Sequence, residues 1–109
     1  MQAFGELVSE AATTTLNAAE LYAGAMGSNR TEEGMRIVQE TLARMPVLPF
    51  GPKAAKAYAT VRRERRQQGL PGGLMDELIA SIAIAEGVPV VTKNVKDFQG
   101  CPGLVVESW

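Results

Sequence analysis

Residues 74–92 have the sequence LMDELIASIAIAEGVPVVT, which combines the pattern of a buried helix with that of a buried strand. One helical stripe consists of Leu74, Leu78, Ile82 and Ala85. Gly87 follows as a typical helix stop signal. Residues 88–92 are then almost continuously apolar, as in a strand covered on both faces of a parallel sheet. The stretch therefore predicts a mostly buried helix over 74–86 that leads into a buried parallel strand.

The same alternation of helix and strand extends over the rest of the chain. We expect a strand near 11–15, a helix over 16–26, a second helix capped by Thr31 and ending before Pro46, an extended piece at 47–50, a third helix from Ala54 to before Gly69, and a strand at 104–107. Strands that alternate with helices indicate an α/β sandwich. Because 109 residues are too few for two separately cored units, we expect residues 1–109 to form one domain.

The composition excludes several kinds of active site. The sequence has no histidine, which removes the commonest general base and every Ser-His or Cys-His nucleophile. The single Cys101 can form neither an internal disulfide nor a zinc site, so we expect a reducing compartment, the cytoplasm. No apolar run approaches the roughly 18 residues of a membrane span, so we expect no membrane partner. If the chain has a catalytic site, we expect carboxylates to carry its chemistry.

Three carboxylates are expected to meet at one edge of the sheet. In α/β units the helix N-termini gather at the carboxyl edge of the sheet, where ligands bind. Glu20 lies early in the first helix, Asp76 lies in the first turn of the helix before residues 88–92, and Asp97 lies in the loop after that strand. Because carboxylates repel one another, such a cluster is stable chiefly around a hard divalent ion such as Mg²⁺ or Mn²⁺. This chemistry suits phosphodiester hydrolysis and predicts a metal-dependent nuclease.

Each of these acids also has a structural interpretation. Glu20 can be a plain surface residue of a helix, and Asp76 can favour the positive end of its helix dipole. Asp97 can cap the turn in which it lies. Glu77, beside Asp76, is expected to be a solvated neighbour. Both interpretations stay open for all three acids.

Basic residues of the third helix are candidate contacts for an RNA backbone. Arg62 and Arg66 lie four residues apart in the run RRERR and are the better candidates for phosphate binding. A run of this kind with Glu64 inside it is more often a solvated helix face.

Three motifs occur in an order that is characteristic of one family. They are TLNAAELYAG at 15–24, DELIASIA at 76–83 and VTKNVKDF at 91–98. In order and spacing they resemble the PIN-domain family, particularly the VapC-like toxins of toxin–antitoxin pairs, and residues 103–109 are similar to that family's last strand. The resemblance covers nearly the whole chain and implies a three-layer α/β/α sandwich with a mainly parallel sheet.

The resemblance also implies a function and its residues. It implies a ribonuclease that uses Mg²⁺ or Mn²⁺, is usually a homodimer and has an antitoxin as its neutralising partner. Glu20, Asp76 and Asp97 match three of the family's four acids, and Thr92 and Asn94 match the polar positions that support the site.

One departure from the family pattern concerns the start of the chain. The family normally opens with a strand that carries its first metal-binding aspartate, and nothing before Glu6 fits that part. We therefore expect the domain to be truncated at its N-terminus by roughly 25–30 residues, judged from ordinary element lengths. Two alternatives to a nuclease stay open: an inactive PIN module that binds protein or RNA, and a structural fragment without a partner.

An absent first strand has a consequence for assembly, because it leaves an open sheet edge. The apolar residues near this edge are Leu7, Val8, Leu16 and Leu21. We expect a homodimer or a strand-exchanged assembly that covers them, with residues 1–26 near the contact.

Overall fold

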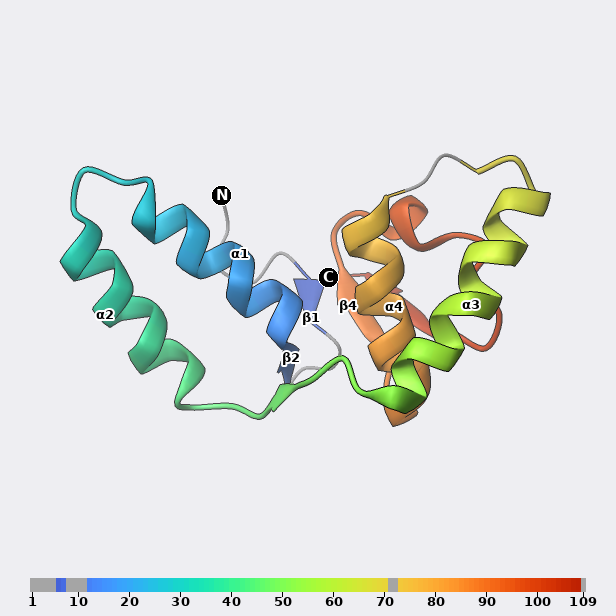
Figure 1. The fold of residues 1–109 in the computed structure, drawn as a ribbon, viewed down its shortest axis with the longest axis horizontal. Coiled ribbons are helices and arrows are strands. Elements are labelled where there is room, and N and C mark those ends of the chain that lie inside the picture. Colours follow the sequence, from blue (N-terminus) through green and yellow to red (C-terminus); the bar gives the residue numbers. More distant parts are fainter. Residues whose placement is uncertain (1–5, 8–11, 71–72, 109) are drawn as a thin grey trace.

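The chain combines short strands with four α-helices in the computed structural model, which describes residues 6–7, 12–70 and 73–108. The elements are β1 (Glu6–Leu7), β2 (Thr13–Thr14), α1 (Thr15–Met26), α2 (Thr31–Leu42), β3 (Val47–Leu48), α3 (Pro52–Gln67), α4 (Leu74–Glu86), β4 (Val90–Thr92), the 3₁₀ helix η1 (Val95–Phe98) and β5 (Val106–Ser108). In Figure 1, α1 and α2 form a hairpin at one end of the molecule, and α3 and α4 lie at the other end. β1 and β4 lie between α1 and α4 in this view, so the α/β architecture expected from the sequence is confirmed.

Local signals set the ends of several helices. The Thr14 side chain accepts a hydrogen bond from the Asn17 N–H at 3.1 Å and so caps α1. Pro52 opens α3 in the first turn, where its missing N–H costs nothing. Gly87 ends α4 in the left-handed conformation, with φ of 69°, as the sequence predicts. Thr31 begins α2 but Arg30 is its cap residue, and the helix ends at Leu42, earlier than expected.

The strands form two small sheets. β4 pairs parallel with β5, which confirms the expected parallel pair, and β1 pairs antiparallel with β4, with Glu6 opposite Thr92. β2 pairs parallel with β3 in the second sheet. The pairing among the described strands is therefore mainly parallel, and β1 is the antiparallel exception. All three residues of β4 are buried, as expected for a strand that is covered on both faces.

The main core is built around α4. Three of its buried apolar residues, Ile79, Ala80 and Ala83, pack with Ala12, Val90 and Phe98. α4 packs mainly against α3 and also contacts α1 and η1, so its burial extends over a wide arc. The predicted stripe is wrong at Leu74, which is 58% exposed because it is the first residue of the helix and projects beyond the packed part.

A second, smaller core holds α1 against α2. Leu21, Ala25 and Val38 are buried there, with Tyr22 and Leu42 packed around them. The expectation that Leu21 needs cover from a second copy of the chain is therefore wrong, because α2 covers it. Val8 and the side chain of Leu7, which belong to the same expectation, lie outside the described residues.

Candidate functional site

Two of the three expected acids line one cavity. Asp76 lies in the first turn of α4 and is half-buried, and Asp97 lies in η1 and is exposed. The cavity has a volume of about 410 Å³ and is lined by Arg65, Leu70, Gly73, Asp76, Lys96, Asp97 and Gln99. Glu20 lies on the exposed side of α1 and is not among these lining residues.

Electrostatic interaction links all three acids. Burial raises the pKa of Asp76 above its ordinary value, and the negative charges of Asp97 and Glu20 raise it further. The Arg65 guanidinium opposes this effect and lowers the pKa of Asp76. The negative charges of Asp97 and Glu20 therefore repel the ionised Asp76 carboxylate, and a bound cation would reduce this repulsion.

The donor set has the chemistry that Mg²⁺ or Mn²⁺ requires. Carboxylate oxygens are hard ligands, and Mg²⁺ is commonly held by one or two carboxylates together with waters and substrate phosphates. Asp76 and Asp97 on one cavity meet that requirement. No cluster of three acidic, cysteine or histidine side chains close enough to hold one ion occurs within residues 6–7, 12–70 and 73–108. The residues present fit an ion that keeps several waters.

The two supporting polar residues lie where β4 turns into η1. Thr92 is fully buried, and its hydroxyl accepts a hydrogen bond from the Asn94 N–H at 3.0 Å. The Asp97 N–H in turn donates to the carbonyl of Asn94 at 3.0 Å. Thr92 and Asn94 thus hold the backbone turn that carries Asp97, which favours the supporting role expected of them.

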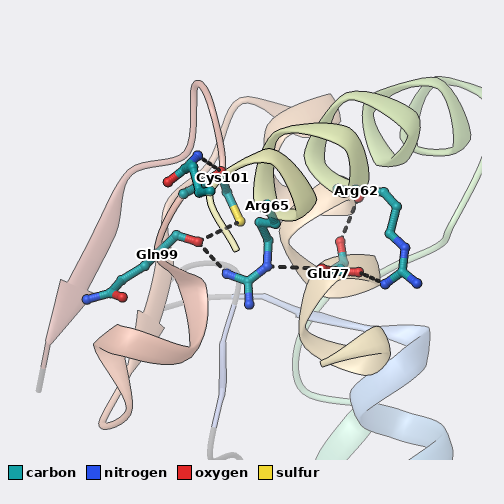
Figure 2. A network of polar contacts seen from close by, with 8 residues as sticks. Arg62, Arg65, Glu77, Gln99 and Cys101 are labelled. Carbon is teal, nitrogen blue, oxygen red and sulfur yellow. Dashed lines mark hydrogen bonds and ion pairs between the residues drawn. The ribbon is translucent and has the colours of Figure 1, made fainter. Parts of the chain in front are cut away.

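Glu77 is not a solvated neighbour, which corrects the expectation from the sequence. Its side chain is 2% exposed, and Figure 2 shows it between two arginines of α3. Its Oε1 lies 3.0 Å from Arg62 Nη1, and its Oε2 lies 3.0 Å from Arg65 Nε. The charge of Glu77 suggested exposure, whereas its position one turn before Ala80 and Ser81 places it on the buried face of α4.

Arg65 is the residue at this cavity that the sequence did not reveal. It is buried, lines the cavity with Asp76 and Asp97, and donates from Nη1 to the carbonyl of Gln99. The available signal was its place in the apolar stripe that also contains Ala54 and Val61, both buried. A charged residue in such a stripe needs a buried partner of opposite sign.

The two expected RNA-binding residues differ in their surroundings. Arg66 is exposed in the last turn of α3. Arg62 is partly exposed, and its charge is already engaged by Glu77. RNA binding by this pair stays a prediction.

In the described part of the chain, no helix combines the length and the hydropathy that a bilayer crossing requires.

Comparisons with known proteins agree with this fold. The family profile described as PIN domain matches residues 2–100. Ribonuclease VapC2 of Rickettsia felis is 37% identical over 98 residues, which are 90% of this chain and 73% of that protein. The tRNA(fMet)-specific endonuclease VapC of Salmonella typhimurium is 34% identical over 90 residues, which are 83% of this chain and 68% of that protein.

Solved structures give the same result. A structure of VapBC2 from Rickettsia felis bound to a DNA fragment from its promoter matches with a TM-score of 0.82 and 36% identity, over 88% of this chain and 72% of that one. The DNA-bound VapBC of Salmonella typhimurium matches with a TM-score of 0.85 and 32% identity, over 90% and 74% of the two chains. With a family match from residue 2 to residue 100 and relatives above 30% identity over most of its length, this chain belongs to the PIN domain family and is VapC-like within it.

Proposed function

We propose that this chain is a metal-dependent ribonuclease and the toxin component of a toxin–antitoxin pair. The observation that carries the proposal is that Asp76 and Asp97 line one cavity while the charge of Glu20 also acts on Asp76. The ribonuclease names of its relatives and the VapBC complexes among its structural neighbours support the same function.

The roles of the residues follow from their placement. When bound, Mg²⁺ or Mn²⁺ neutralises phosphate oxygens and activates a water for attack on phosphorus. Asp76, Asp97 and Glu20 would hold the ion directly or through water. Thr92 and Asn94 keep the turn before Asp97 in place. The exposed Lys96 lines the same cavity, so its ammonium is available to an RNA phosphate.

The proposed assembly is a homodimer that is neutralised by an antitoxin, in the cytoplasm. Large apolar side chains remain exposed on the α1–α2 hairpin, where Met26 is 62% and Ile37 is 50% exposed. A second copy or an antitoxin that covers them would gain free energy by removing them from water. We place the contact between copies near residues 1–26.

An inactive binding module is the second candidate, and one observation favours it. No three potential ligands converge on one point in the part of the chain that the structure describes. A site with too few ligands would leave the fold able to bind a partner but unable to place an ion.

Incubation of the purified chain with single-stranded RNA separates the two candidates. We expect cleavage with Mn²⁺, no cleavage with EDTA, and loss of cleavage in Asp76→Asn and Asp97→Asn. Glu86→Gln, at the far end of α4, is the matched control and should cleave as the unmodified chain does. Degradation that persists in EDTA, or no cleavage of any RNA, would contradict the nuclease proposal.

A further inference from the structure

Arg65 joins three segments that lie far apart in the sequence. It belongs to α3, its Nε contacts Glu77 in the opening turns of α4, and its Nη1 donates to the carbonyl of Gln99 just after η1. Figure 2 shows the guanidinium between these partners, with Arg62 on the far side of Glu77. Both carboxylate oxygens of Glu77 are thus occupied by guanidinium groups, which fixes the orientation of the Arg65 fork.

The two partners of Arg65 are neighbours of the two cavity acids. Glu77 directly follows Asp76, and Gln99 comes two residues after Asp97. Arg65 itself lines the cavity that contains both acids. One side chain therefore connects the side chain that follows Asp76 on α4 to the backbone that follows Asp97.

A second contact holds the same turn against the end of α3. Gly100 has φ of +74°, and a Cβ atom at this position would lie 2.7 Å from Leu70 Cδ1 and 2.8 Å from Gln68 Oε1. The positive φ favours glycine, and a Cβ atom would fit only if the ends of the Leu70 and Gln68 side chains moved away. The turn after η1 is thus positioned from two sides, by the Arg65 fork and by close packing at Gly100.

A buried ion pair is a poor way to gain stability, because apolar residues of similar size often stabilise a fold as well or better. What such a pair adds is direction, since each hydrogen bond restricts the position of both partners. On this ground, and on the proposed function, we propose that Arg65, clamped by Glu77, is a positioning residue that sets the separation of Asp76 and Asp97 and thereby their affinity for a divalent ion.

The test compares two double variants that carry the same substitutions. Arg65→Met with Glu77→Gln removes the buried pair without leaving an unpaired buried charge. Arg63→Met with Glu64→Gln removes a more exposed ion pair, whose residues both lie on α3 and whose Nε–Oε2 distance is 3.4 Å. Arg65→Lys keeps the positive charge but loses the forked guanidinium. It replaces Arg65→Met/Glu77→Gln in the test if that double variant folds poorly.

Two measurements are made on each folded variant. Calorimetric titration with Mn²⁺ should show binding about 10- to 100-fold weaker for Arg65→Met/Glu77→Gln, the range typical of residues that orient metal ligands, and unchanged for Arg63→Met/Glu64→Gln. Hydrogen exchange without metal should show faster exchange of the amides of residues 97–101 in the first variant only, with the amides of α1 unaffected. On RNA, kcat should fall while KM stays constant, because the change affects the reacting geometry and not substrate binding.

The outcomes separate the two proposals. If the unmodified chain binds Mn²⁺ and Arg65→Met/Glu77→Gln binds it equally well, the positioning role is overturned and the nuclease proposal stands. Unchanged exchange at residues 97–101 overturns it as well. If Arg65→Lys keeps both the Mn²⁺ affinity and the exchange rates of the unmodified chain, charge alone is sufficient and the fork geometry is not required, which also contradicts the proposal. If the unmodified chain does not bind Mn²⁺ at all, the metal site and the positioning role are both overturned.

Discussion

Glu77→Gln tests whether the carboxylate of Glu77 is buried in solution as it is in the structure. The substitution keeps size and shape but removes the charge that faces Arg62 and Arg65, each 3.0 Å away. Arg62 is 35% exposed and can turn to water, whereas Arg65 is 5% exposed and cannot. The cost is therefore mainly that of a buried guanidinium that loses the carboxylate on α4 and keeps its other contacts, among them the carbonyl of Gln99.

The expected magnitude follows from that burial. Removing one partner of a buried pair costs about 3–5 kcal/mol, and we expect about 3 kcal/mol because the glutamine oxygen still accepts one hydrogen bond. A loss of this size is a large fraction of the roughly 5–15 kcal/mol by which a domain is stable. The melting temperature of the apo protein should fall by about 12 °C or more.

Urea unfolding followed by circular dichroism measures this free energy. Glu64→Gln is the matched control, because Glu64 pairs with Arg63 on the same helix but at a more exposed position, and its loss should stay below about 1 kcal/mol. Equal losses for the two variants would refute the reasoning, since Glu77 would then be hydrated in solution.

Three further predictions concern charge and assembly. Asp76→Asn should raise the melting temperature of the apo protein at pH 7. Because the folded state raises the pKa of Asp76 from 3.8, the ionised carboxylate destabilises the fold above that pH. The gain in melting temperature should therefore shrink as pH falls towards 3.8. A lower melting temperature at every pH in scanning fluorimetry would favour the capping role instead. Arg66→Gln should weaken RNA binding and reduce the slope of log affinity against log salt by about 1, whereas Arg36→Gln on α2 should not; fluorescence anisotropy in a salt series measures both, and equal effects would exclude a specific role for Arg66. Sedimentation at micromolar concentration should show a homodimer, and a stably folded monomer would contradict the proposed assembly.

The parts of the fold that depend on local sequence could be predicted. The helix over 74–86 and its end at Gly87 follow from helical periodicity and from the freedom of glycine to adopt positive φ. The burial of β4 follows from its continuous apolar run. The placement of Asp76 and Asp97 on one cavity follows from the rule that helix N-termini and strand carboxyl ends share one edge of a parallel sheet.

The tertiary structure decided what depends on partners that are distant in the sequence. In a sequence, a charged residue is expected to be exposed unless its counter-ion is known. Glu77 forms its ion pair with Arg65 only because α3 packs on α4. The cover of Leu21 by α2 and the antiparallel pairing of β1 with β4 are decided in the same way. The sequence by itself therefore determined the four helices, the buried strand β4 and the placement of Asp76 and Asp97 near one another. Packing decided which charges are buried, because the free energy of a buried charge depends on what lies opposite it and not on its neighbours along the chain.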